Sequence, residues 1–326
     1  MDLFTNANYN FTKWRWHAIA FSAILVVLGV VEVARQGMPL GIDFSGGTIV
    51  IVKFQETTSE QAVRDALEVL PGEKVVQQYG NPDGHEILVR LPQVHQAEEG
   101  TNLERGAREV TDAIRAANIG QFEVINTEIV GPVVGKDLQR KGIYATLASI
   151  IGIALYIAFR FRPSFAVGAI AATLHDVIVT LAVLAFFGYE LSLNIIAAIL
   201  TITGYSVNDT IVIFDRVREN FRTMRGASLE NQVNTAVNQT LSRTIITAGT
   251  TFLSVLALFL FGGEVLEGFA FTMLVGIVSG TYSTVFIASA IAIALSKSQA
   301  NTPAAPAAPA RSASDRAARR RERRNA

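Results

Sequence analysis

The chain has 326 residues, of which 50% are hydrophobic and only 17% are charged. A soluble globular protein carries about 25% charged residues, so this composition excludes an ordinary soluble domain and favours a membrane protein. The chain has no cysteine, which excludes a disulfide framework and a thiolate metal site.

Six apolar stretches are each near the ~20 residues that a helix needs to cross the hydrocarbon core of a bilayer. The first is somewhat long for the apolar region of a signal peptide, and no small-residue cleavage site follows it near Ala34, so we expect an uncleaved signal anchor. The six stretches run over residues 17–34, 142–159, 165–187, 193–214, 244–261 and 268–295.

The formal net charge of zero conceals an asymmetry along the chain. Residues 36–141 are rich in Asp and Glu, whereas residues 311–326 are rich in Arg. Lys and Arg also precede the first apolar stretch and lie between the second and third and between the fourth and fifth, while the other two connections carry only acids. Because basic connections stay in the cytoplasm, we expect both termini there and residues 36–141 outside.

These patterns divide the chain into a cytoplasmic N-terminus (1–15), a first transmembrane helix (16–35), an external domain (36–141), a bundle of five transmembrane helices (142–298) and a disordered basic tail (299–326). The tail is rich in Ala, Pro, Ser and Arg, a composition that does not form a packed core. It is either a solvated segment that anchors this end at anionic lipid or a contact site for nucleic acid or the ribosome.

The external segment predicts one small α/β domain with the element order βαββαβ. A β-branched run after Gly46 and Gly47 is typical of a strand, and a helical pattern that Thr57 or Thr58 could cap follows it. The tetrapeptide 81–84, Asn-Pro-Asp-Gly, is a strong turn signal between the next two strands. The order is that of a ferredoxin-like fold, which many unrelated functions share. The predicted strands are 48–54, 74–79, 86–91 and 122–130, and the predicted helices are 59–70 and 103–117.

Asp209 is the most informative residue, because it lies near one end of the apolar stretch 193–214. A carboxylate in hydrocarbon costs roughly 2.5–3.5 kcal/mol even on mild insertion scales, so such residues usually face a bundle interior or a water path. Thr201, Tyr205 and Asn208 share a helical face with Asp209. This pattern predicts a helix that lines an internal water path and serves proton or ion chemistry.

The next apolar stretch is preceded by the complementary charge, Arg243. The two helices are antiparallel, and Asp209 and Arg243 lie at similar depths, so we expect them to pair. One interpretation is a switch that opens when Asp209 takes up a proton, and the other is a static buried pair that holds the bundle together. The face of Arg243 continues through Thr247, Thr250, Thr251 and Ser254.

The third apolar stretch contains His175 and Asp176 near its middle. Neighbouring residues on a helix point about 100° apart, so we do not expect both side chains to face one groove squarely. Asp176 either extends a relay from Asp209 or is a structural peg that hydrogen-bonds the backbone. His175 is too isolated to indicate a metal site. The chain has no Walker A motif and no arrangement for nucleophilic catalysis, so we expect neither an enzyme nor a cofactor.

The sixth apolar stretch has a small residue at every fourth position, which allows another helix to approach closely. We therefore expect a packing face there. Its residues are Gly268, Thr272, Gly276, Gly280 and Thr284.

Six segments, taken in order, resemble the SecF family, membrane subunits of the bacterial protein-export machinery. The resemblance runs from about Phe4 to Ala294 and leaves out the tail. Ala248 is a small departure, because Ser is common at this position in the family. The segments are Gly41–Thr48, His175–Asp176, Gly204–Asn220, Ser242–Thr244, Phe261–Gly263 and Gly280–Ser283, and the one around Asp209 is the most specific.

The resemblance implies a member of the resistance-nodulation-division superfamily in the bacterial inner membrane, with residues 36–141 in the periplasm. It implies pairing with SecD, association with the SecYEG channel and often with YajC, and use of the proton-motive force to help export preproteins after the SecA motor has acted. In that family the residues matching Asp209 and Arg243 are the proton-relay candidates. Other relay or structural candidates are His175, Asp176, Tyr205, Asn208 and Thr247, and the family's motif at the periplasmic entry is matched by Gly41, Asp43, Gly46 and Gly47.

Six spans and one external domain correspond to half of a transporter built from two repeats, so we expect an obligate partner. The alternative function is half of a proton-coupled small-molecule or lipid exporter of the same superfamily, although the external domain is small for a drug-binding porter. A third interpretation is a passive assembly factor, in which Asp209 and Arg243 are structural.

Overall fold

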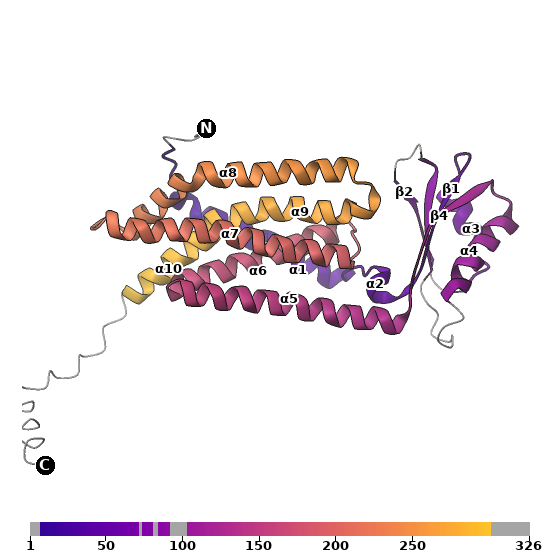
Figure 1. Cartoon of the computed structure of the whole chain (residues 1–326), viewed down its shortest axis with the longest axis horizontal. Helices are drawn as coiled ribbons and strands as arrows, with labels where there is room; N and C mark the ends of the chain where they lie inside the picture. The colour runs from indigo at the N-terminus through magenta and orange to yellow at the C-terminus, as the bar shows by residue number, and fades with distance from the viewer. Residues whose placement is uncertain (1–6, 72–73, 81–83, 92–102, 301–326) are drawn as a thin grey trace, which may run out of the picture.

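The computed structural model describes residues 7–71, 74–80, 84–91 and 103–300. A bundle of long helices meets a small α/β domain at one end, and helix α10 (Ser289–Ala300) lies at the opposite end of the bundle (Figure 1). Within the described residues, six helices are long and apolar enough to cross a membrane, which confirms the predicted number of spans. The predicted tail lies almost wholly outside the described residues.

The spanning helices are longer than the apolar stretches that predicted them. Helix α5 begins at Pro132 and α8 begins at Leu229, because polar turns continue both helices ahead of their apolar residues. At 1.5 Å per residue the 31 residues of α7 measure roughly 46 Å, well beyond a hydrocarbon core of about 30 Å. A short helix η1 (Phe11–Trp14) precedes the spans, which are α1 (Arg15–Gln36), α5 (Pro132–Arg160), α6 (Pro163–Phe186), α7 (Leu193–Thr223), α8 (Leu229–Phe261) and α9 (Glu264–Ser283) with its continuation through the π-helical turn η3 (Thr284–Ala288) into α10 (Ser289–Ala300).

Local sequence signals set where these helices begin. Pro132 and Pro163 occupy the first turn of α5 and α6, where a missing N–H group leaves no helical hydrogen bond unmade. Ser192 and Ser228 cap α7 and α8, since their hydroxyls accept hydrogen bonds from backbone N–H groups in the first turn.

The α/β domain has the predicted βαββαβ order. Its four strands form one antiparallel sheet in the order β2-β3-β1-β4, which is the ferredoxin-like arrangement. Val50 and Val52 of β1 and Val89 of β3 pack with Val110 and Ile114 of α4 in its core. The predicted turn at 81–84 falls largely outside the described residues. The elements are β1 (Gly47–Phe54), α3 (Glu60–Ala66), β2 (Val75–Tyr79), β3 (Glu86–Leu91), α4 (Leu103–Ala117) and β4 (Phe122–Val130).

Helices α6, α7 and α9 form the centre of the bundle, while α1, α5 and α8 expose many apolar side chains. Small residues let α9 approach α7 closely. A Cβ atom at Gly276 would overlap the side chain of Ile202, and one at Gly280 would lie 2.9 Å from the Cβ of Ser206. The small-residue face predicted for the sixth apolar stretch therefore packs on α7.

Candidate functional site

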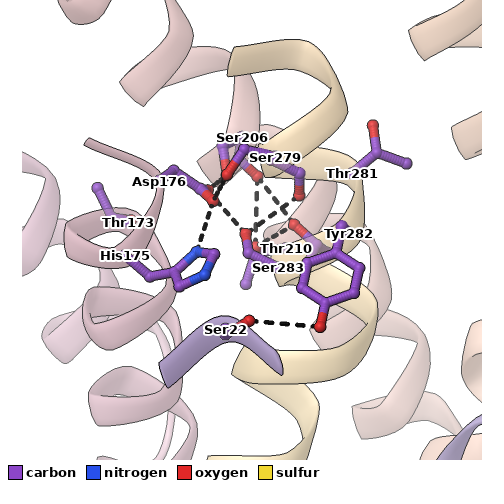
Figure 2. Close-up of polar contacts among 12 residues, drawn as sticks. Ser22, Thr173, His175, Asp176, Ser206, Thr210, Ser279, Thr281, Tyr282 and Ser283 are labelled. Carbon is purple, nitrogen blue, oxygen red and sulfur yellow. Dashed lines mark hydrogen bonds and ion pairs between the residues drawn. The ribbon is translucent and has the colours of Figure 1, made fainter. Parts of the chain in front are cut away.

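Asp176 of α6 is the acid at the centre of the bundle, where it is 1% exposed. Its Oδ2 accepts hydrogen bonds from the hydroxyls of Ser206 (2.6 Å) and Ser283 (2.7 Å), and its Oδ1 accepts one from Ser279 (2.8 Å). Because these serines belong to α7 and α9, one carboxylate joins three helices (Figure 2). These side-chain hydroxyls thus supply the hydrogen bonds that the carboxylate loses when it is removed from water.

His175 lies beside Asp176, although we expected the two side chains to point apart. Its Nδ1 is 3.1 Å from Oδ1 of Asp176, and its Nε2 is buried without a hydrogen-bond partner in the described part of the chain. The Cβ atoms of neighbouring helical residues diverge, but the far ends of the two side chains curve toward each other. In the described ranges no group of three or more His, Cys, Asp or Glu side chains is placed to hold a metal.

Sequence analysis does not single out Ser206 or Ser279, because a serine in a transmembrane helix commonly bonds to its own helix backbone. A signal is present all the same. Ser279 and Ser283 are four residues apart on one face of α9, and Ser283 ends a segment shared with the SecF family. That this face meets Asp176 depends on how the helices pack, and no local pattern encodes it.

Threonine hydroxyls extend the polar contacts from this serine cluster to the π-helical turn η3. The hydroxyls of Thr210 and Thr284 are 2.9 Å apart, and Thr284 also donates to the backbone carbonyl of Ser206 at 3.4 Å. Ser289 donates to the carbonyl of Thr284, five residues earlier. Single π-helical turns occur frequently at functional sites in helices.

Asp209 is also buried in α7, at 5% exposure, but it shares none of the hydrogen bonds of the Asp176 cluster. Among the described residues its Oδ2 has no hydrogen-bond partner, and neither has the buried hydroxyl of Tyr205 one turn earlier. An unpaired buried carboxylate oxygen is costly, so gain or loss of a proton at Asp209 changes the local energy strongly.

Arg243 lies on α8, which packs against α7, but its side chain is exposed on the single chain. Across the residues that the structure describes, no ion pair within 4.0 Å joins it to Asp209. The two residues expected to pair are therefore on neighbouring helices and are not in direct contact.

The sides of α7 and α8 that carry these residues form an exposed polar face. Thr201 and Asn208 of α7 are exposed, as is Thr250 of α8. Thr247, which is half-buried, donates to the backbone carbonyl of Arg243 at 2.9 Å, and Thr250 likewise bonds within its own helix. We name this surface the polar face: Thr201, Gly204, Asn208, Arg243, Thr250 and Ser254.

The segment Gly41–Gly47 joins the α/β domain to the start of α7. Asp43 lies in the short helix α2 (Ile42–Ser45), and its Oδ2 accepts a hydrogen bond from the backbone N–H of Leu193 at 2.8 Å. The N–H of Gly41 donates to the carbonyl of Leu191 at 2.8 Å. Gly46 and Gly47 have φ values of 71° and 136°, a region that favours glycine. This segment therefore links strand β1 directly to the first turn of α7.

Comparison with protein families relates both the helix bundle and the segment that joins it to the α/β domain to the same families of export proteins. The sequence matches the family described as "Protein export membrane protein SecD/SecF, C-terminal" over residues 109–298. It matches the "SecD/SecF GG Motif" family over residues 33–58, which contains the joining segment. The expectation drawn from the six segments is thereby confirmed at the level of the family.

Individual relatives agree with this result. The chain is 44% identical to the protein translocase subunit SecF of Rhodothermus marinus, over 90% of this chain and 96% of the relative. It is 39% identical to the SecF subunit of Escherichia coli O157:H7, over 88% of both chains.

The fold is also that of a solved protein. The crystal structure of SecDF from Thermus thermophilus, described as a translocon-associated membrane protein, superposes with a TM-score of 0.80 at 35% identity, over 91% of this chain. A second SecDF structure, in a super-membrane-facing form, gives a TM-score of 0.67 at 36% identity. This chain spans 40% of the length of either solved chain.

Proposed function

Since the chain belongs to the SecF family of protein translocase subunits, we propose that it pairs with a SecD subunit and couples the proton-motive force to late steps of preprotein export across the bacterial inner membrane. It is a multi-pass membrane protein of the Sec pathway. In the proposed orientation both termini are cytoplasmic and the α/β domain is periplasmic. In this proposal the proton gradient supplies the energy for preprotein export, and the chain uses neither a cofactor nor a hydrolytic step.

The observation that carries the proposal is the state of Asp209. This carboxyl group is buried in a spanning helix, and its Oδ2 lacks a hydrogen-bond partner among the described residues. Arg243 lies on the next helix without touching it. A proton on Asp209 removes a buried charge, and its loss restores the attraction to Arg243. Alternation between these two states would shift α7 against α8.

The polar face supports the pairing with SecD. An arginine left exposed on the side of a spanning helix is costly, and polar faces in membrane helices are normally turned toward protein. A second six-helix unit laid on this face would cover Arg243 and bring further groups near Asp209. The solved SecDF chain is much longer than this one, as a protein with both halves must be. Association with SecYEG, and with YajC, follows in the proposal from family membership.

The joining segment supports transmission of the motion to the α/β domain. Asp43 caps α7, the helix that carries Asp209, and Gly47 begins strand β1. A displacement of α7 along its axis therefore reaches the domain through few rotatable bonds. The alternative, half of a small-molecule or lipid exporter, would need a substrate cavity in this domain, and none of the observations above favours it.

The variant Asp209→Asn tests the proposal, with Glu219→Gln on the same helix as the matched control. Both variants are produced with SecD, and preprotein export is measured in inner-membrane vesicles with and without a protonophore. We expect Asp209→Asn to co-purify with SecD and to lose the stimulation by the gradient, whereas Glu219→Gln keeps it. Export that stays gradient-stimulated in Asp209→Asn overturns the relay. Failure of that variant to assemble supports a structural role for Asp209 instead.

A further inference from the structure

A basic cavity lies at the end of the bundle opposite the α/β domain. It has a volume of about 530 Å³ and is formed where α5 ends, α6 begins and α7 extends past them. Four arginines line it, Arg160 and Arg162 from the α5–α6 turn and Arg218 and Arg222 from α7. None of these residues has a place in the proton-coupled function above. We call this cavity the arginine pocket.

Aromatic side chains form the apolar wall of the arginine pocket. Phe165 and Phe214 are 5% and 2% exposed, and their ring centroids are 5.0 Å apart in an edge-to-face contact. Phe161 packs on Phe214 at 5.9 Å, and Phe221 packs on Phe165 at 6.0 Å. These contacts fix the wall, so the pocket is a built part of the fold and does not depend on surface side chains alone.

Two of the guanidinium groups are held in place by the same rings. The Arg162 guanidinium carbon lies 5.2 Å from the centroid of Phe221, and that of Arg160 lies 5.2 Å from the centroid of Phe161. Arg160 also donates to Asp215 at 2.7 Å. Across the residues that the structure describes, Arg218 and Arg222 have no acidic partner within 4.0 Å. The pocket thus has four positive charges and one neighbouring carboxylate.

We propose that the arginine pocket binds the phosphate group of an anionic phospholipid. Guanidinium groups bind phosphate oxygens through paired N–H donors, and convergent arginines favour a phosphate ester over a zwitterionic headgroup. Basic pockets between spanning helices at the cytoplasmic surface are typical sites for acidic headgroups.

The position of the pocket favours a lipid over phosphate from solution. Arg160 is the last residue of a spanning helix and Pro163 is the first residue of the next, so the pocket lies at the level where the apolar spans end. Phe159, which precedes Arg160, is 96% exposed, and Val167 on α6 is 49% exposed. These apolar side chains offer a surface for acyl chains beside the charged headgroup site.

The test measures lipid binding to the purified full chain in detergent by native mass spectrometry. Phosphatidylglycerol and phosphatidylcholine with the same acyl chains are titrated, each with and without millimolar inorganic phosphate. The double variant Arg162→Gln/Arg218→Gln is compared with the control Arg216→Gln. Arg216 lies on α7, as Arg218 does, but it pairs with Glu219 and does not line the pocket. A thermal unfolding curve for each variant confirms that the fold is retained.

We expect phosphatidylglycerol to bind at least tenfold more tightly than phosphatidylcholine. The double variant should weaken that binding roughly 25-fold, since each basic residue near a membrane surface contributes about fivefold, and Arg216→Gln should stay within about twofold. Equal affinity for the two lipids, or an unchanged double variant, overturns the proposal. Displacement of the lipid by inorganic phosphate assigns the pocket to phosphate from solution and also overturns it.

Discussion

Nη1 of Arg90 in strand β3 lies 2.5 Å from Oε1 of Glu190 in the loop between α6 and α7. The other guanidinium nitrogen, Nη2, donates to the carbonyl of Leu40 at 2.7 Å and to the hydroxyl of Ser45 at 2.8 Å. The Arg90 side chain is only 14% exposed. One arginine therefore ties the sheet of the α/β domain both to the membrane bundle and to the segment that caps α7.

Removal of the contacts of Arg90 should let the α/β domain move more freely relative to the helix bundle without unfolding the domain. Glu190 is 36% exposed at its side chain, so the pair itself should contribute no more than about 1 kcal/mol. Arg90→Ala should cost more than Glu190→Ala, because it also leaves the Leu40 carbonyl and the Ser45 hydroxyl oxygen without the donor that Arg90 supplies.

Pulsed electron paramagnetic resonance between spin labels on α4 and α8 measures this loosening as a broader distance distribution. Lys53→Ala, which removes an ion pair inside the sheet, is the control. Distributions that are equally narrow in Arg90→Ala and Lys53→Ala would contradict a role for Arg90 as a tie.

Asp176→Asn and Asp209→Asn should differ in their effect on stability. An amide at position 176 retains one acceptor oxygen and presents N–H donors to hydroxyls that donate, so we expect a loss of about 2 kcal/mol or more. At position 209 the Oδ2 atom has no partner to lose among the described residues and the amide removes a buried charge, so the loss of stability should be below about 1 kcal/mol.

Thermal unfolding midpoints of the two purified variants in the same detergent check this difference. Equal midpoints would mean that the Asp176 cluster does not hold the three helices together. A large loss for Asp209→Asn alone would give Asp209 the structural role.

The spans and the α/β domain were open to prediction because their signals are local. Six apolar stretches gave six spans. The β-branched run at 48–54 and the turn signal before 86–91 placed strands within a residue of β1 and β3. Helix ends were less predictable. The turns before residue 142 in α5 and before residue 244 in α8 are polar. A search for apolar stretches therefore does not predict that these helices extend beyond the membrane.

The site was less open to prediction, since it depends on which helix faces meet. The burial of Asp209 followed from its position in an apolar stretch, but its separation from Arg243 did not. The cluster around Asp176 joins residues 30 to 107 positions apart in the chain, and only the packing of α7 and α9 on α6 brings them together.

Gly276→Ala should destabilise the bundle, because the added methyl group would overlap Ile202 of α7. Overpacking of this kind typically costs about 1–3 kcal/mol. We expect a cost near the upper end of this range, because the backbones of α7 and α9 would have to move apart. Gly204→Ala is the matched control, since nothing lies within 4 Å of a Cβ atom there and alanine favours helix by about 1 kcal/mol. Unfolding of both variants in detergent provides the measurement, and a Gly276→Ala protein as stable as Gly204→Ala would show that α7 and α9 are not in close contact.

The stabilising contribution of Tyr189 to the folded protein should be lost at alkaline pH. Its hydroxyl donates to Oε1 of Glu267 at 2.6 Å, and burial together with the negative charge of Glu267 raises the pKa of this phenol well above its ordinary value near 10. The folded protein therefore keeps a proton that the unfolded chain releases above about pH 10, and stability falls as pH rises from there toward the folded pKa. Below about pH 10 this contribution is fully present.

The test compares unfolding midpoints of the natural protein and Tyr189→Phe from about pH 8 to about pH 11. The natural protein should be more stable by about 1 kcal/mol at the lower pH, and the difference should shrink above about pH 10. Tyr144→Phe, at a tyrosine that is 68% exposed, is the control. A gap between the natural protein and Tyr189→Phe that stays constant or widens with pH would mean that the phenol does not hold its proton through Glu267.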